Sequence, residues 1–269
     1  MTAGHCLRPF SSYDQIRIWA TNPDGVLRVI DAWPFDGHGK SNSDPIDYAF
    51  LRIAANARGN SPVTETDELC LLGDPADFQT PVLVIARKGS DPVKVHDHAY
   101  VWFPFSASDE TMKTMRKEVL LRTDRVGTEW FPDSPEKKRD YVDRYLQAFD
   151  DAYLRVDTHY EYHAGRGEFS GVKRPLFGMD TDTFHGNSGA PVFSRTEDYP
   201  EICIVGVFAG GALDGAPVTE AHFQEHEFAT PLSEIIADLR NLPINQGSPS
   251  AEQQETRKQL VLSVLAALK

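Results

Sequence analysis

The sequence predicts a mainly β protein with a helical insertion and C-terminal helices. Short segments rich in β-branched and aromatic residues, separated by Gly, Pro, Asn and Asp, occur before residue 108 and again after Thr158. Between these two parts, and again near the C-terminus, apolar residues repeat at helical spacing instead. These two patterns predict two β regions joined by a helical one.

The first β region starts with a predicted hairpin. Ile16–Trp19 and Val26–Ile30 flank the residues Asn22-Pro23-Asp24-Gly25, which are typical of a tight turn between antiparallel strands. Three further strands are predicted at Asp47–Ile53, Pro81–Arg87 and Ala99–Phe105.

Two surface helices are predicted over 108–157. The first starts at Ser108, where Asp109 and Glu110 follow, and the second at Ser134, where Pro135 suits the first helical position. The apolar positions of the two helices are Met112, Met115, Val119 and Leu120, then Tyr141, Tyr145, Phe149, Ala152 and Val156. One apolar face per helix favours packing on the protein's own surface over a cofactor or partner groove.

The C-terminal part combines strands and helices. Strands are predicted at Ala190–Phe193 and Glu201–Phe208, and a helix follows Thr230-Pro231. Ser250 and Gln253 have the spacing of a capping box, which predicts a terminal helix after a linker of 243–249. We expect its apolar stripe to pack on the body of the chain rather than form a dimer seam; the stripe comprises Leu260, Val261, Val264, Leu265 and Leu268.

Composition excludes several functions. The 27 Lys and Arg against 40 Asp and Glu give a net charge of −13, which argues against a nucleic-acid binder. The longest apolar run, 202–213, contains three glycines and is too short to span a membrane. Three cysteines cannot all pair within the chain, so stability is not expected to depend on a disulfide framework.

Three short segments carry the residue types of nucleophilic catalysis. They are Thr2-Ala3-Gly4-His5-Cys6, Asp47-Tyr48-Ala49-Phe50-Leu51 and Gly186-Asn187-Ser188-Gly189-Ala190. A serine hydroxyl is a weak nucleophile near neutral pH, so an imidazole must accept its proton, and a carboxylate must orient that imidazole. In the order His, Asp, Ser, the segments resemble the trypsin-like (chymotrypsin-fold) serine peptidases, especially their bacterial glutamyl-endopeptidase-like branch.

The resemblance implies a fold and a triad. It implies a chymotrypsin-like double β-barrel that hydrolyses peptide bonds through an acyl-enzyme, with no cofactor or metal and a polypeptide as substrate. Ser188 would be the nucleophile, His5 the general base and Asp47 the orienting carboxylate, with the backbone N–H groups of Gly186 and Ser188 as oxyanion hole. The alternative is a catalytically inactive homologue that binds proteins.

The resemblance also implies substrate-binding residues. Asp182 and Thr183 would line the primary specificity pocket, and Ala209-Gly210-Gly211 would pair with the substrate backbone. Asp182 favours a Lys or Arg side chain, whereas an Asp-Thr pair also occurs in glutamate-specific relatives. Those relatives carry a histidine where this chain has Phe208, so specificity stays open. Asn187 carries no charge for a new N-terminal ammonium to pair with, so we expect no zymogen activation of that kind.

Two histidine clusters could suggest a metal instead. His222-Phe223-Gln224-Glu225-His226 matches a zinc-peptidase pattern, which requires a helix and a third ligand. Its surroundings predict a loop that enters the last strand. The segment 96–98, His-Asp-His, is predicted to be a solvated turn.

The resemblance predicts an incomplete N-terminal barrel. Members of the family carry the first strands of this barrel before the histidine motif, whereas His5 lies at the start of this sequence. We therefore expect the reading frame to begin upstream of Met1. The usual disulfide partner of Cys6 would lie in that upstream part. The resemblance also favours a secreted or periplasmic location. The expected domains are 1–80, the incomplete N-terminal barrel; 81–242, the C-terminal barrel with the insertion; and 243–269, the linker and terminal helix.

Overall fold

The structure is a computed structural model of the chain. It describes residues 1–19, 26–35, 46–54, 70–73, 79–86, 92–103, 109–158, 162–163, 168–169, 175–181, 187–194, 202–211 and 226–268. The predicted hairpin turn at 22–25 lies outside these residues. No helix in the described ranges is long and apolar enough to cross a membrane.

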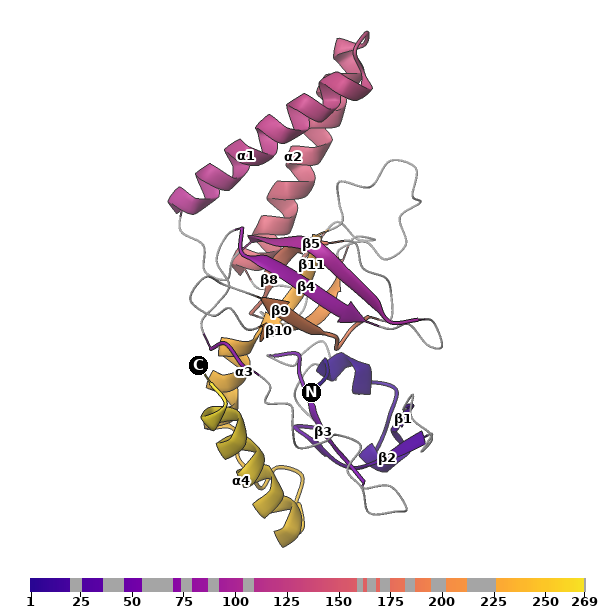
Figure 1. Cartoon of the computed structure of the whole chain (residues 1–269), viewed down its shortest axis with the longest axis vertical. Coiled ribbons are helices and arrows are strands. Elements are labelled where there is room, and N and C mark those ends of the chain that lie inside the picture. Colours follow the sequence, from indigo (N-terminus) through magenta and orange to yellow (C-terminus); the bar gives the residue numbers. More distant parts are fainter. Residues whose placement is uncertain are drawn as a thin grey trace.

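Six strands form a closed barrel, as Figure 1 shows in its middle part. Around the barrel their order is β10-β11-β8-β5-β4-β9, and every pair is antiparallel. The strands are β4 (Pro81–Ala86), β5 (Lys94–Phe103), β8 (Phe177–Asp180), β9 (Pro191–Ser194), β10 (Cys203–Gly211) and β11 (His226–Pro231). Alternate residues of β4, namely Val82, Val84 and Ala86, are buried in the barrel core, as a strand with one buried face requires.

The N-terminal sheet is small and open over the described residues. It contains β1 (Arg17–Trp19), β2 (Val26–Trp33) and β3 (Phe50–Ile53) in the order β1-β2-β3. Thr2 pairs with Ala49, just before β3, through two backbone hydrogen bonds of 2.8 and 2.7 Å. In the 3-10 helix that follows, Gly4–Leu7, the side chain of Leu7 packs with Val29 and Ala32 of β2.

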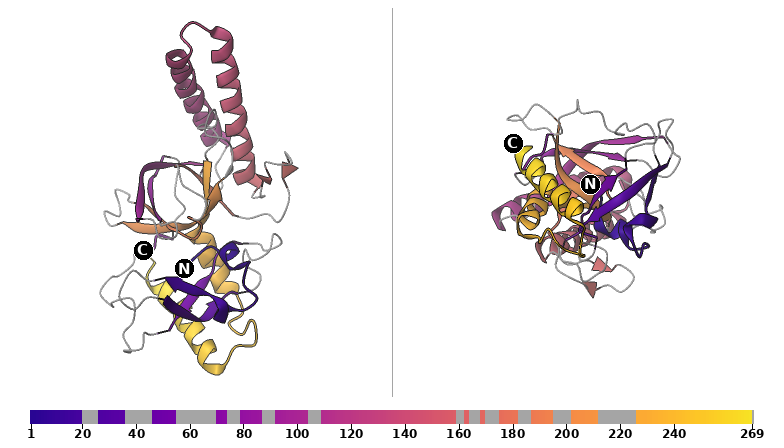
Figure 2. Two further views of the ribbon diagram at one scale, coloured as in Figure 1. Left: turned by 90° about the vertical axis from the view of Figure 1, so that its right-hand side faces the viewer. Right: turned by 90° about the horizontal axis from the view of Figure 1, so that it is seen from below.

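A long helical hairpin projects from one end of the barrel (Figures 1 and 2). It consists of α1 (Asp109–Trp130) and α2 (Pro135–Thr158), where the sequence predicted two surface helices. At its base Met115, Val119 and Phe149 pack with Leu176 and Phe228 of the barrel. Two short strands follow the hairpin, β6 (Tyr162–His163) and β7 (Glu168–Phe169).

Two C-terminal helices connect the barrel to the N-terminal sheet. They are α3 (Leu232–Asn241) and α4 (Ala251–Ala266), and the predicted capping box of Ser250 and Gln253 is present at the start of α4. The stripe of α4 packs on the body of the chain, as predicted. A buried ion pair also fixes α4, because Arg257 donates to both carboxylate oxygens of Asp31 on β2, at 3.0 and 2.8 Å.

The state of the cysteines agrees with their odd number, whereas one expected turn is wrong. A disulfide joins Cys70 to Cys203, which are 133 residues apart in sequence, and leaves Cys6 as a free thiol. The expected turn at 96–98 is wrong, because these residues lie inside β5. The strand starts at Lys94, and its first residues pair with the end of β4, Ala86 with Lys94 and Ile85 with Val95.

Candidate active site

His5 and Asp47 form a two-point contact. The Nδ1 atom of His5 lies 2.7 Å from Oδ2 of Asp47, and the backbone N–H of His5 donates to Oδ1 of the same carboxylate at 2.8 Å. The carboxylate is almost fully buried, with 3% of the Asp47 side chain exposed against 25% for His5. A buried acceptor next to Nδ1 favours the tautomer that carries its proton there, which leaves Nε2 as the basic nitrogen.

The surroundings of His5 favour its charged form. Burial of the imidazole opposes protonation, but the hydrogen bonds to Asp47 and Cys6 and the charge of Asp47 outweigh it and raise the pKa of His5 to about 10. A histidine must be neutral to act as a base. The arrangement therefore predicts proton acceptance that improves as the pH rises above the ordinary histidine range.

Ser188 lies on a turn that packs against the segment leading to His5. The carbonyl oxygen of Ser188 is 3.5 Å from Sγ of Cys6. Gly189 adopts a φ of +88°, and a β-carbon built on it would lie 2.3 Å from Oγ1 of Thr2. The close approach of the two segments therefore depends on glycine at position 189. No hydrogen bond joins the His5 imidazole to the Ser188 hydroxyl, although both residues are described.

Three further side chains fix the Asp47 segment, and the sequence motifs assigned none of them a role at the site. Tyr48, which is completely buried, lies with its hydroxyl 2.6 Å from Oδ2 of Asp238 on α3. Burial and this carboxylate both raise the pKa of the Tyr48 phenol, so the phenol stays protonated and donates the hydrogen bond. On the barrel side, Oγ1 of Thr230 lies 3.2 Å from the carbonyl oxygen of Asp47. No sequence pattern indicates these contacts, which span 190 and 183 residues.

The predicted substrate-pairing strand is the end of β10. β9 pairs with β10 up to Val207, and the last backbone bonds on this side join Phe208 to Gly189 and Ala190. Beyond Phe208, the segment 209–211 pairs with β11 on its other side. Within the described ranges its β9-side edge therefore has no strand partner. The side chain of Phe208 is buried in the barrel core, and Ala209 packs against the base of the helical hairpin.

Several predicted residues lie outside the described part of the chain. These are Asp182 and Thr183 of the specificity pocket, Gly186 of the oxyanion hole, and 222–225 of the zinc-like pattern. Of that pattern, His226 is the first residue of β11 rather than part of a helix. Among the described residues, no three His, Cys, Asp or Glu side chains gather in a way that could hold a metal ion.

Comparisons with known proteins give likenesses of structure only. No protein-family model matches the chain, and no curated protein matches it. One similar solved structure is Rv3671c from M. tuberculosis H37Rv, as a serine-to-alanine mutant in its inactive form. The two sequences are 13% identical, the match covers 93% of this chain and 78% of that chain, and the TM-score is 0.45. Another is the inactive form of the Rv3671c protease, which is 14% identical in sequence. That match covers 89% of this chain and 77% of that chain, with a TM-score of 0.45.

Proposed function

We propose that this chain is a serine endopeptidase with His5, Asp47 and Ser188 as its catalytic triad. The observation that carries the proposal is the two-point contact of the buried Asp47 carboxylate with the ring and the backbone of His5. This contact supplies the orienting half of a triad. The packing of the Ser188 turn against Thr2 and Cys6 supports a nucleophile next to that pair.

In the proposed mechanism, Oγ of Ser188 attacks the carbonyl carbon of the scissile peptide bond while Nε2 of His5 accepts the hydroxyl proton. The imidazolium then gives this proton to the leaving nitrogen, the C–N bond breaks, and the acyl group stays on Ser188. Water, deprotonated by His5, hydrolyses the ester and restores the serine. The charged form of His5, which Asp47 stabilises, is the form needed between the two proton transfers.

The proposed oxyanion hole consists of backbone N–H groups of Gly186 and Ser188. The substrate would extend along the β9-side edge of 209–211, where its backbone can add to the barrel as a further strand. Asp182 and Thr183 are proposed as pocket residues, and the cleaved residue type stays open between basic and acidic side chains. Since Phe208 is buried in the barrel core, we propose that it supports the wall of the pocket from behind.

A second candidate function is an inactive homologue that binds polypeptides in the same cleft. One observation favours it, namely that no hydrogen bond connects His5 with Ser188 in this structure. Catalytic hydrogen bonds are often long without substrate and shorten when it binds, so this observation does not outweigh the Asp47 contact.

Hydrolysis of fluorescently labelled casein, measured from pH 7 to 10, tests the proposal. We expect Ser188→Ala and His5→Ala each to lower the rate by at least about a thousandfold, because the residues of a triad act as one unit. Ser134→Ala, a serine in the turn between α1 and α2 that joins the two helices of the hairpin, is the matched control and should retain the rate. Equal rates for Ser188→Ala and the unsubstituted chain would rule out the proposed nucleophile, and no hydrolysis at any pH would favour the inactive homologue.

A further inference from the structure

The corner between β11 and α3 holds the Asp47–Tyr48 pair at two points. Thr230, near the end of β11, lies with Oγ1 3.2 Å from the carbonyl oxygen of Asp47. Asp238, on α3, accepts a hydrogen bond of 2.6 Å from the Tyr48 hydroxyl. Only Pro231 lies between Thr230 and the start of α3, so both contacts come from one continuous piece of the chain. The backbone that carries Asp47 is therefore tied to a single corner of the barrel.

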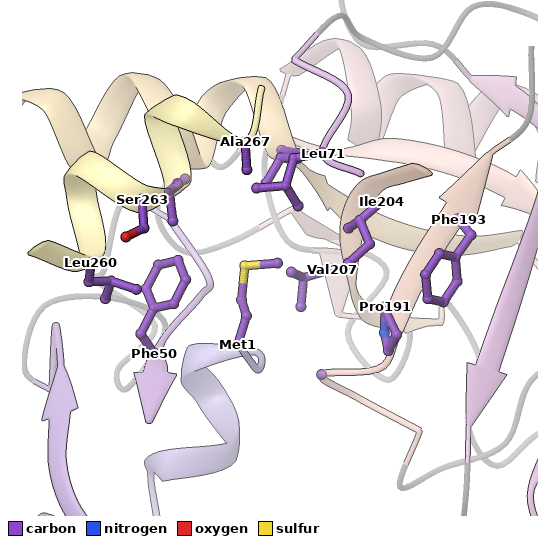
Figure 3. A pocket seen from close by; sticks show the side chains of 13 residues that line it. Met1, Phe50, Leu71, Pro191, Phe193, Ile204, Val207, Leu260, Ser263 and Ala267 are labelled. Atoms are coloured by element: carbon purple, nitrogen blue, oxygen red, sulfur yellow. The ribbon is translucent and has the colours of Figure 1, made fainter. Parts of the chain in front are cut away.

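The Tyr48 hydroxyl is the polar part of an otherwise apolar contact. Tyr48 is completely buried in an apolar cluster with the inner face of α3, and its ring meets that of Phe50 edge-on, with centroids 5.9 Å apart. Figure 3 shows Phe50 beside Leu260 of α4, in the hollow between α4 and the barrel. This packing holds the ring and would also hold a phenylalanine, whereas the bond to Asp238 requires the hydroxyl.

Asp238 is an acceptor in a fixed place. Its neighbours on α3, namely Ile235, Ile236 and Leu239, are buried in the same cluster, so the helix cannot withdraw from Tyr48 without exposing them. A carboxylate acceptor also makes the bond shorter and stronger than one between neutral groups. Asp238 itself is only partly buried, so water can replace the phenol when the hydroxyl is removed. We therefore expect Tyr48→Phe to fold.

The Asp47 carboxylate depends on where its backbone is held. Oδ2 lies 2.7 Å from Nδ1 of His5, and Oδ1 accepts from the backbone N–H of His5 at 2.8 Å. Within the described ranges both oxygens bond to His5 and to no other residue, so a shift of the Asp47 backbone would move the carboxylate away from the imidazole. A displacement of about 1 Å in a catalytic group can lower a rate about a hundredfold.

We propose that Tyr48 is a positioning residue of the triad, and that its hydrogen bond to Asp238 holds Asp47 where both carboxylate oxygens reach His5. Since Tyr48 is fully buried, it acts through Asp47 and not on the substrate. Loss of the hydroxyl should therefore lower turnover and leave KM unchanged. The catalytic part of this inference rests on the proposed function, whereas the geometric part does not.

The geometric part is tested by the pKa of His5, measured by NMR on the Ser188→Ala chain with labelled histidine. His5→Gln in the same background identifies the signal of this residue among the nine histidines. Burial opposes the proton of His5, but the titratable neighbours Asp47 and Cys6 outweigh it and raise the pKa of His5 to about 10. A nearby opposite charge contributes about 1–3 pKa units, so Tyr48→Phe should lower the pKa of His5 by at least about one unit. An unchanged pKa would overturn the proposal.

Substitutions of Asp238 separate positioning from a direct effect of charge. Asp238→Asn keeps an acceptor for the Tyr48 hydroxyl and should preserve the pKa of His5, whereas Asp238→Leu removes the acceptor and should lower it as far as Tyr48→Phe does. In Tyr48→Phe/Asp238→Leu the two losses should not add, because both break the same hydrogen bond. Equal losses in Asp238→Asn and Asp238→Leu would overturn the proposal, since they would assign the effect to the charge of Asp238.

A buried tyrosine elsewhere provides the matched control. Tyr141→Phe, on α2 in the helical hairpin, should leave the pKa of His5 unchanged. Circular dichroism checks that each variant is folded, and Asp238→Leu tests the bond by itself should Tyr48→Phe fail to fold.

Casein hydrolysis by chains that keep Ser188 tests the catalytic part. Tyr48→Phe and Asp238→Leu should each lower kcat about 10- to 100-fold with KM unchanged. Because a lower pKa makes His5 neutral at lower pH, the rise of kcat with pH should also move to lower pH in both variants. An unchanged kcat with a lowered pKa of His5 would overturn the catalytic part. If the unsubstituted chain does not hydrolyse casein, the proposed function fails, while the NMR titration still decides whether Tyr48 positions Asp47.

Discussion

Replacing Gly189 with alanine tests how the Ser188 turn is held against the His5 segment. The added β-carbon would lie 2.3 Å from Oγ1 of Thr2 and 3.0 Å from the backbone nitrogen of Ala3. Thr2 cannot withdraw easily, because both of its peptide groups bond to Ala49. The residue also adopts a φ of +88°, which is unfavourable for alanine.

The expected magnitude follows from these two costs. The left-handed conformation costs an alanine about 1–2 kcal/mol, and a forced contact in a packed region adds about 1–3 kcal/mol. Gly247→Ala is the matched control, since Gly247 has a φ of +77° and its added β-carbon meets nothing within 4 Å. Gly189→Ala should therefore lower the free energy of unfolding by about 1–3 kcal/mol more than Gly247→Ala.

Urea denaturation followed by circular dichroism measures this difference. In the double variant Thr2→Ala/Gly189→Ala the contact with Oγ1 is gone while the one with Ala3 remains, so part of the loss should be recovered. Equal losses for Gly189→Ala and Gly247→Ala would show that the Ser188 turn does not meet Thr2 as described.

Three further predictions concern stability. Arg257→Met leaves the Asp31 carboxylate buried without its charged partner and should cost about 3–5 kcal/mol in urea denaturation, and a loss below about 1 kcal/mol would contradict the described pair. The raised pKa of His5 means that the folded chain holds this proton more tightly, so its contribution is complete below about pH 6.5 and is lost as the pH rises towards about 10. The free energy of unfolding should therefore fall over this range, and His5→Gln should flatten the fall, whereas an unchanged slope would speak against the Asp47 contact. Reduction of the Cys70–Cys203 disulfide opens a loop of 133 residues and should cost up to about 5 kcal/mol, seen as a lower Tm, whereas an unchanged Tm would mean that the bond does not form.

Local patterns in the sequence predicted most of the elements. The apolar, β-branched run in 81–87 became β4, and the helical spacing after Ser108 and Ser134 became the hairpin. The capping box at Ser250 marked the start of α4 correctly. Such signals act over a few residues, so a sequence displays them directly.

Features that depend on distant residues were missed. The polar run at 96–98 suggested a turn. The prediction failed because pairing with β4, which local preference does not reveal, holds this run extended in β5. The pairing of Cys70 with Cys203 and the contact of Tyr48 with Asp238 are set by the way the barrel and α3 pack, over 133 and 190 residues. For the site, motif order indicated His5, Asp47 and Ser188, and the structure adds the contact between the first two.

Covalent labelling with a fluorophosphonate tests whether Ser188 is the nucleophile of this chain. Mass spectrometry of the intact chain and its peptides, at pH values from 7 to 10, locates the adduct. We expect one adduct per chain, on Ser188, formed faster as His5 loses its proton and absent in Ser188→Ala. An unlabelled Ser188 over this whole range, or an adduct that persists in Ser188→Ala, would contradict it.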